Sequence, residues 1–174
     1  MSISPHHLRR AMIRDALIYW LYIPAAVIGG GAVLDLLFGL RALPPYRWLT
    51  YSAIILIAGG VILIQKATWD LKHYGNGTPN PMAPPERLVT SGSYAYCRNP
   101  MFLGYDLAAL GFILLCRSQG MLVAAYPLFI LLQVRFLRNR EETVLVQRFG
   151  AEFQTYRDHV PFLIPRLYGK GKPS

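Results

Sequence analysis

The chain contains few of the residues that form disulfides or bind metal ions. It has 2 cysteines and 4 histidines among its 174 residues. Cys97 and Cys116 are expected at opposite ends of one apolar segment, which is too far apart for a disulfide. The histidines show no metal-ligand spacing and have no cluster of cysteines or carboxylates around them; they are His6, His7, His73 and His159. We therefore predict neither a structural disulfide nor a metal site.

Phosphate-binding motifs are also missing. Residues 75–85 read GNGTPNPMAPP, but no Lys-Ser or Lys-Thr pair completes a P-loop. The glycines of this segment have no strand–turn–helix context, so they do not form a dinucleotide fingerprint either. Because it is dense in glycine and proline, the segment is predicted to be a semi-rigid loop. It either lines a pocket or only connects two helices.

Charged residues make up 16% of the chain, against 53% hydrophobic residues, and the mean hydropathy is +0.30. This composition indicates an all-α integral membrane protein, with a single membrane domain over residues 1–174. Apolar segments at 16–40, 48–67, 101–116 and 120–134 predict about four transmembrane helices, followed by a C-terminal helical segment. The turn at residues 117–120 predicts a tight hairpin of the last two helices. Glycines at 29–31 and 59–60 predict close packing of the first two helices.

Acidic residues are half as numerous as basic ones, 9 against 18, which gives a net charge of +9. The distribution of this charge favours a membrane topology over nucleic-acid binding. Lys and Arg are concentrated before the first helix, in the middle loop and after the last helix, whereas the other side of the membrane receives Arg41, Arg47 and Arg117. By the positive-inside rule, both termini and the middle loop are predicted to be cytoplasmic. The expected partners are membrane lipids and no nucleic acid.

Residues 92–104 (GSYAYCRNPMFLG) contain a helix start beside a cation. Asn99 is a suitable N-cap and Pro100 suits the first turn of a helix. Such a helix directs its free N–H groups and the positive end of its dipole toward the water-facing pocket that Arg98 reaches. The segment therefore predicts an anion-binding site at the membrane surface, facing the cytosol.

Two adjacent acids, Glu141 and Glu142, follow the last apolar segment on a helix that is expected to continue beyond the membrane. Neighbouring residues on a helix point about 100° apart, so at most one of these side chains faces the pocket squarely. The alternative interpretation is a solvated helix on which Arg138 pairs with one of the two acids.

The order of these parts resembles the isoprenylcysteine carboxyl methyltransferase family and the related phospholipid methyltransferases. The resemblance extends over residues 92–165 and rests on Gly92-x-Tyr94, the RNPMFxG motif at 98–104, EExxLxxxFGxxFxxY at 141–156 and the VPF motif at 160–162. Asn99 stands where many relatives have histidine, and Phe102 where many have tyrosine. The resemblance implies a polytopic enzyme that binds S-adenosylmethionine in residues 88–165, at the cytoplasmic end of the last two helices.

The resemblance also assigns roles to individual residues. Arg98, with the helix start at Asn99 and Pro100, suits the carboxylate of S-adenosylmethionine, and Glu141 or Glu142 suits its ammonium and sulfonium groups. The remaining predicted cofactor-binding residues are aromatic or belong to the motif: Tyr94 and Phe102 beside the adenine or sulfonium, Gly104, and Tyr156 from the tail. The catalytic candidates are Arg98, Glu142 and Asp106.

Carboxylates inside membrane segments are functional candidates because burying them is costly. Asp106 either contacts the acceptor or hydrogen-bonds a neighbouring helix, and Asp35 is expected to be structural, with Arg41 as a candidate partner. The predicted acceptor is lipidic or otherwise apolar. A carboxylate acceptor needs no base, whereas an amine must lose a proton; the sequence leaves oxygen, nitrogen and sulfur methylation open. The alternatives are an NADPH-dependent sterol-type reductase and a non-catalytic lipid-binding protein.

Overall fold

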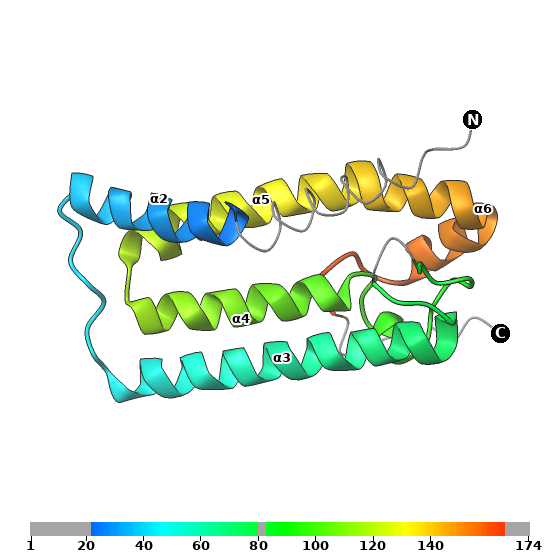
Figure 1. Ribbon diagram of the computed structural model, residues 1–174, viewed down its shortest axis with the longest axis horizontal. Helices are drawn as coiled ribbons and strands as arrows, with labels where there is room; N and C mark the ends of the chain where they lie inside the picture. The colour runs from blue at the N-terminus through cyan, green and yellow to red at the C-terminus, as the bar shows by residue number, and fades with distance from the viewer. Residues whose placement is uncertain (1–21, 80–82, 166–174) are drawn as a thin grey trace.

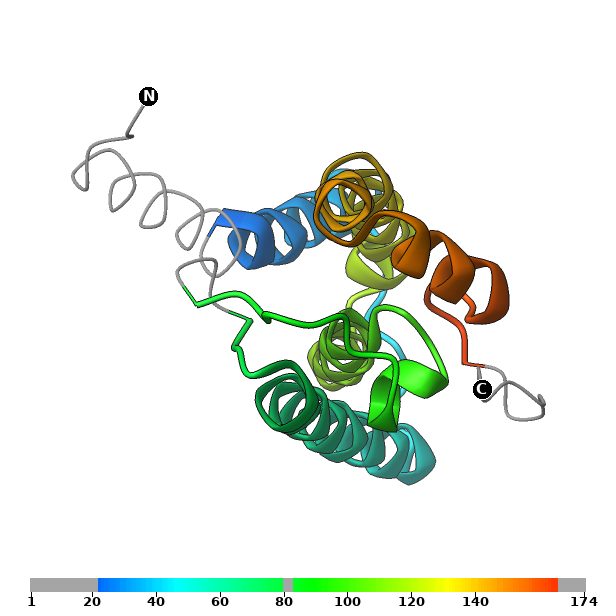
Figure 2. The same ribbon diagram turned by 90° about the vertical axis from the view of Figure 1, so that its right-hand side faces the viewer.

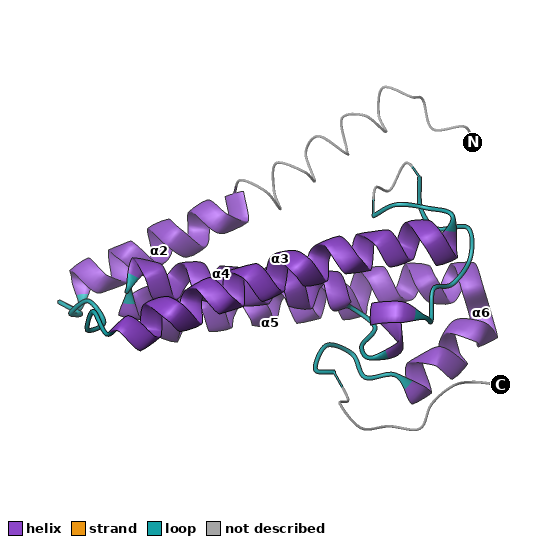
Figure 3. Ribbon diagram, turned by 90° about the horizontal axis from the view of Figure 1, so that it is seen from below, coloured by secondary structure: helices purple, strands orange, loops and turns teal. Residues whose placement is uncertain are grey.

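The computed structural model describes residues 22–79 and 83–165, and these residues form helices, turns and loops with no β-strand. Figure 3 shows the helices running alongside one another, with the loops gathered at the two ends. The elements, in chain order, are α2 (Ile23–Leu37), α3 (Arg47–Gly75), the 3-10 helix η2 (Gly92–Ala95), α4 (Pro100–Cys116), the π-helix η3 (Met121–Ala125), α5 (Tyr126–Phe136), the π-helix η4 (Leu137–Glu141) and α6 (Glu142–His159). The all-α prediction is confirmed for the described residues.

Helices α3 and α4 pack side by side because small residues line their contact (Figure 1). A Cβ atom on Gly104 would lie 2.8 Å from the carbonyl oxygen of Gly60, and one on Gly111 would lie 2.6 Å from that of Ala53. Gly60 was predicted to allow close packing against the first helix, but the helix that packs against it is α4. Gly31 packs against Met121, while Gly29 and Gly30 have open space beside them.

The second layer consists of α2 and the long helical run from Met121 to His159 (Figures 1 and 2). The predicted hairpin between α4 and this run is present, and Arg117 makes its turn with a positive φ of 54°. Asp35 of α2 accepts hydrogen bonds from the Ser118 hydroxyl and from the Gly120 N–H, the latter at 2.7 Å. Asp35 is structural as predicted, but its hydrogen-bond donors lie at the start of this helical run and not at Arg41.

Helices α3 and Met121–His159 are long and apolar enough to cross a bilayer, with mean hydropathies of 1.9 and 1.5. The most apolar window of α3 is only 11% buried, so α3 is not the core helix of a water-soluble protein. Its exposed side chains, such as Ile55 at 70%, form a surface suited to lipid. The apolar helices Ala25–Leu37 and Pro100–Cys116 are shorter. The number of crossings, the cytoplasmic sidedness and the single-domain boundary stay predictions, and residues 16–21 of the first predicted helix lie outside the described residues.

Candidate functional site

A buried carboxylate near the end of α3 supports the segment that leads into the site. Asp70 is completely buried, and its Oδ2 accepts hydrogen bonds from the Ser93 N–H at 2.7 Å and from the Ser93 hydroxyl at 2.6 Å. Lys66, one turn earlier, pairs with Oδ1 at 3.0 Å. Gly92 has a φ of 66°, and a Cβ there would lie 2.5 Å from the Asp70 carboxyl group. Asp70 therefore holds η2 against α3, a role that sequence analysis missed although a lone acid near the end of an apolar helix was the available signal.

Arg98 is held from three directions between η2 and α4. Its backbone N–H donates to the Pro161 carbonyl at 2.9 Å, and Nη1 donates to the Arg157 carbonyl at 3.0 Å. Nη2 lies 3.0 Å from Oε1 of Glu142, and the two side chains are only 11% and 15% exposed. Burial lowers the pKa of the Arg98 guanidinium, and the negative charge of Glu142 opposes that shift. The alternative in which Arg138 pairs with Glu142 was wrong, because Glu142 pairs with Arg98.

The π-helix η4 decides which of the two acids faces Arg98. A π-turn inserts one residue into the helix, so it rotates everything that follows by about 100° relative to an unbroken α-helix. Leu137 is fully buried. In an unbroken α-helix, the residue four positions later, Glu141, would lie on the same side of the helix as Leu137. With the extra residue, Glu142 takes that place and Glu141 is exposed.

Asn99 precedes α4 as predicted, and Pro100 occupies the first turn, but the Asn99 side chain does not cap the helix. Its Nδ2 instead donates to the Phe162 carbonyl at 2.9 Å. Asn99 thus occupies the predicted N-cap position, but its side chain bonds the returning tail in place of the helix N–H groups. The Phe162 ring lies beneath two guanidinium groups, with its centroid 5.7 Å from Cζ of Arg98 and 5.0 Å from Cζ of Arg138.

The tail returns to α4 because α6 bends at Gly150, which has a φ of 55° (Figure 1). Beyond the bend, Phe153 and Tyr156 are buried in a small apolar cluster with Val160. The Tyr156 hydroxyl donates to the Tyr94 carbonyl at 2.7 Å, which ties the tail to η2. Burial raises the pKa of the Tyr94 phenol above its usual range, so this ring is an uncharged wall at neutral pH.

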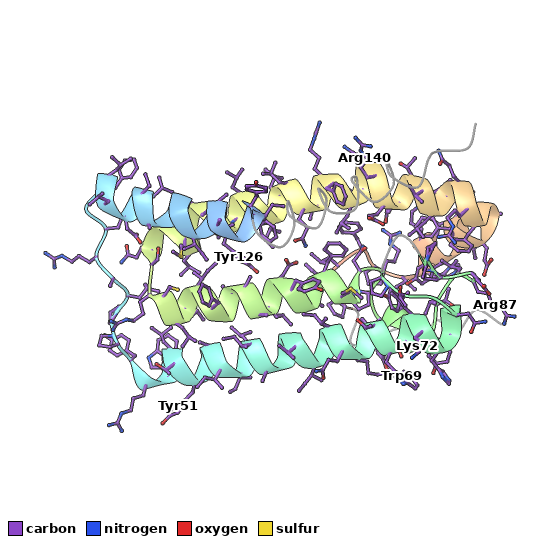
Figure 4. The ribbon with its side chains drawn as sticks, in the orientation of Figure 1. Tyr51, Trp69, Lys72, Arg87, Tyr126 and Arg140 are labelled. Atoms are coloured by element: carbon purple, nitrogen blue, oxygen red, sulfur yellow. The ribbon has the colours of Figure 1, made fainter. Side chains whose placement is uncertain are left out.

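A cavity lies between η2, the start of α4, α6 and the loop that follows α3. Its lining residues are Leu71, Pro85, Arg87, Leu88, Val89, Tyr94, Arg98, Asn99, Glu142, Leu145, Arg148, Phe149, Phe153 and Tyr156. Of the predicted loop 75–85, only Pro85 lines the cavity among the described residues, together with Arg87, Leu88 and Val89 just beyond it. Residues 80–82 lie outside the described part. Arg148 fixes this loop through a 2.6 Å hydrogen bond from Nη2 to the Pro85 carbonyl. In Figure 4, Arg87 lies at the end of the molecule opposite Tyr51.

The structure brings together part of the predicted cofactor-binding set. Tyr94, Arg98, Asn99, Glu142 and Tyr156 line the cavity, whereas the predicted residues Pro100, Phe102, Gly104, Asp106 and Glu141 do not. Gly104 packs against α3 and Glu141 is exposed, which explains why neither lines the cavity. Arg148, Leu145, Phe149 and Phe153 were missed as cavity residues; the last three belong to the apolar face of α6.

Asp106 lies outside the cavity, on the side of α4 that faces α5. It is 4% exposed, and its Oδ2 accepts a 3.0 Å hydrogen bond from Nε2 of Gln133. The Tyr126 hydroxyl donates to the Asp106 carbonyl at 3.0 Å, and Figure 4 shows Tyr126 between the two layers. Of the two predicted roles for Asp106, the contact with a neighbouring helix is therefore present.

Two polar atoms at the cavity are left without hydrogen-bond partners among the described residues, Nε of Arg98 and Oε1 of Glu142. Oε1 is close to Nη2 of Arg98, yet the pair forms no well-directed hydrogen bond. Unsatisfied polar groups are costly when buried, so both atoms favour a ligand that completes their bonding. A donor atom and an acceptor atom side by side fit a zwitterion, such as the amino-acid end of S-adenosylmethionine.

Comparison with known proteins identifies the family. A sequence profile of the phospholipid methyltransferase family matches residues 48–152, which include α4, α5, nearly all of α3 and most of the residues that line the cavity. The chain belongs to this family. It is 28% identical over 127 residues to the protein-S-isoprenylcysteine O-methyltransferase of Mus musculus, covering 70% of this chain and 43% of that protein. It is 34% identical over 77 residues to methanethiol S-methyltransferase 2 of Bradyrhizobium diazoefficiens, covering 44% and 28%.

The fold is also that of a solved family structure. The chain superposes on the eukaryotic intramembrane Ras methyltransferase, isoprenylcysteine carboxyl methyltransferase, with a TM-score of 0.56 at 20% identity, covering 88% of this chain and 54% of the other. This phospholipid methyltransferase family member thus spans less than half the length of the curated relatives above. A delta(14)-sterol reductase of Mus musculus also matches, at 30% identity over 89 residues, but only 21% of that protein is covered.

Proposed function

We propose that this protein is a membrane methyltransferase that uses S-adenosylmethionine and transfers the methyl group to a lipidic or otherwise apolar acceptor. Family membership supports the reaction class. The observation that supports the cofactor is the Arg98–Glu142 pair, whose Nε and Oε1 atoms are unsatisfied beside a largely apolar cavity. Arg98 is the partner for a carboxylate, and Glu142 is the partner for an ammonium group.

S-adenosylmethionine supplies a methyl group that its sulfonium already activates for displacement. The protein then has to hold donor and acceptor in line and exclude water. Arg98 is suited to this task because the Pro161 and Arg157 carbonyls hold it in place. Tyr94, Phe149, Phe153 and Tyr156 provide aromatic walls that exclude water, and such rings also attract a cation.

The side from which each substrate arrives is part of the proposal. The cavity lies at the end of the molecule that receives the middle loop and the tail, both rich in Lys and Arg, so we place it on the cytoplasmic side. A polar cofactor enters there from water. The apolar acceptor enters laterally from the bilayer, because the helices expose apolar side chains along their length.

Calorimetric titration of the protein in nanodiscs tests the proposal. S-adenosylmethionine should bind saturably, and Arg98→Ala and Glu142→Gln should each weaken binding at least about tenfold, the value of one lost charge-assisted hydrogen bond. Matched controls are the adjacent exposed residues Arg140→Ala and Glu141→Gln, which should change affinity less than about twofold. NADPH is titrated separately. Binding of NADPH alone would favour the sterol-type reductase, and no binding of either cofactor by folded protein would favour a non-catalytic role.

A further inference from the structure

The unsatisfied atoms of the cavity are not the only ones in the protein. In the described part of the chain, the Oδ1 atom of Asp106 is also buried without a hydrogen-bond partner. Only its other oxygen is satisfied, by Gln133. A carboxylate at membrane depth is expensive to bury, and an unpartnered oxygen adds to that cost. The packing of α4 against α3 does not involve Asp106, because small residues such as Gly104, on the opposite side of the helix, make that contact.

The position of Asp106 connects it with the cavity. Asp106 lies in the second turn of α4, about 9 Å along the helix from its start beside the cavity residue Asn99. On the facing helix, Gln133 is the partner of Asp106 and Glu142 is the partner of Arg98. The buried Leu137 lies between these two along the chain. The two polar pairs thus mark the deep end and the cavity end of one seam between α4 and the Met121–His159 helix.

We infer that Asp106 receives the reacting group of the acceptor, and that this group is a proton-bearing nitrogen or sulfur, an amine or a thiol, rather than a carboxylate. The inference rests on the proposed methyltransferase function. Gln133 donates to Oδ2, which leaves Oδ1 as the oxygen that can accept a further hydrogen bond. An N–H or S–H group completes that bond. An acceptor carboxylate brings a second negative charge to a buried carboxylate, which is strongly unfavourable.

The proton balance supports the same assignment. An ammonium group or thiol transfers its proton to Oδ1 of Asp106, which becomes a neutral carboxylic acid. The freed nitrogen or sulfur forms a bond to the methyl carbon as the bond from that carbon to the sulfonium sulfur breaks, and the electron pair of the broken bond stays on the departing thioether. The proton on Asp106 is afterwards lost to water. A carboxylate acceptor carries no such proton and needs no base.

The test uses full-length protein in phosphatidylcholine nanodiscs, a lipid without a transferable amine proton, and labelled S-adenosylmethionine. Three acceptors are compared: phosphatidylethanolamine as amine, dodecanethiol as thiol, and N-acetyl-S-farnesylcysteine as carboxylate. Methyl transfer to the amine or to the thiol is expected, with the carboxylate at least about tenfold poorer. Asp106→Asn keeps the size of the side chain and should lower kcat at least about 100-fold, the usual contribution of a general base. Its S-adenosylmethionine affinity should stay within threefold.

Asp35→Asn is the matched control, since Asp35 is an intramembrane carboxylate at the far end that is already hydrogen-bonded to Ser118 and Gly120. Its kcat per folded molecule should stay within threefold. Preferred transfer to the carboxylate, transfer to neither the amine nor the thiol, or an Asp106→Asn enzyme within threefold of wild type would overturn the inference. If Asp106→Asn does not fold, the acceptor preference of the wild-type protein decides alone. Failure to bind S-adenosylmethionine would instead refute the proposed function.

Discussion

Replacing Gly92 by alanine tests whether Asp70 holds the site together. The new Cβ would lie 2.5 Å from the Asp70 carboxyl atoms and would face a φ of 66°. The backbone conformation alone costs about 1–2 kcal/mol for a residue with a side chain. Displacing the Asp70 carboxylate from its two Ser93 hydrogen bonds adds about 2 kcal/mol or more, because bonds to a buried charge are strong. We expect Gly92→Ala to lower the free energy of unfolding by about 3–4 kcal/mol.

Gly39→Ala is the matched control. Gly39 has a φ of 59°, and no atom lies within 4 Å of a Cβ built there. This variant therefore pays only the backbone cost, about 1–2 kcal/mol. Both variants are compared by denaturant titration in mixed micelles, and S-adenosylmethionine affinity is measured on the folded fraction. Equal losses of stability in the two variants would refute the role assigned to the Asp70–Ser93 contact.

Three further predictions concern the tail, the cysteines and the helix packing. Tyr156→Phe removes the hydrogen bond to the Tyr94 carbonyl and should cost about 1 kcal/mol in thermal or denaturant unfolding; an unchanged stability would contradict this contact. Cys97 is 1% exposed, and burial raises the pKa of its thiol to about 11, whereas Cys116 is exposed. In single-cysteine variants at pH 8, maleimide should therefore label Cys116 at least about tenfold faster than Cys97. The labelling rate of Cys97 should rise as the pH approaches 11. Gly111→Ala should destabilise the protein by about 1–3 kcal/mol because its Cβ meets α3, whereas Gly30→Ala, which has open space beside it, should not be destabilising.

The apolar segments were predictable because burial in lipid imposes a composition that can be read directly. The segment 101–116 matches α4 to within one residue, and the hairpin turn is where its polar residues indicated. Helix α3, in contrast, continues to Gly75, eight residues beyond the predicted end, because Asp70 is satisfied by Lys66 on the same helix and by Ser93 and does not interrupt the helix. Composition alone does not reveal such pairings.

The sequence predicted which residue types form the candidate site, but it did not predict which of the two adjacent acids faces Arg98. Arg98 and the pair of acids were identified through the family resemblance, which implies a zwitterionic cofactor that needs both charges. The selection of Glu142 depends on one inserted residue in η4, and no local sequence pattern distinguishes that π-turn from a continuous helix. The Asn99 side chain was assigned to the helix start because local rules describe only local partners. Its actual partner, Phe162, follows 63 positions later and comes close only after the bend at Gly150.

The bend at Gly150 also bears on how the protein is made. The helices that pack in the membrane precede residue 142, whereas the groups that hold Arg98 from behind are the carbonyls of Arg157 and Pro161. During synthesis, the membrane bundle can therefore assemble while Arg98 still lacks its supports. Only when residues 151–162 emerge from the ribosome and fold back onto α4 does the cavity close. A nascent chain arrested before that point would be inserted in the membrane and yet lack the completed cavity, so maturation of the site is separated in time from membrane insertion.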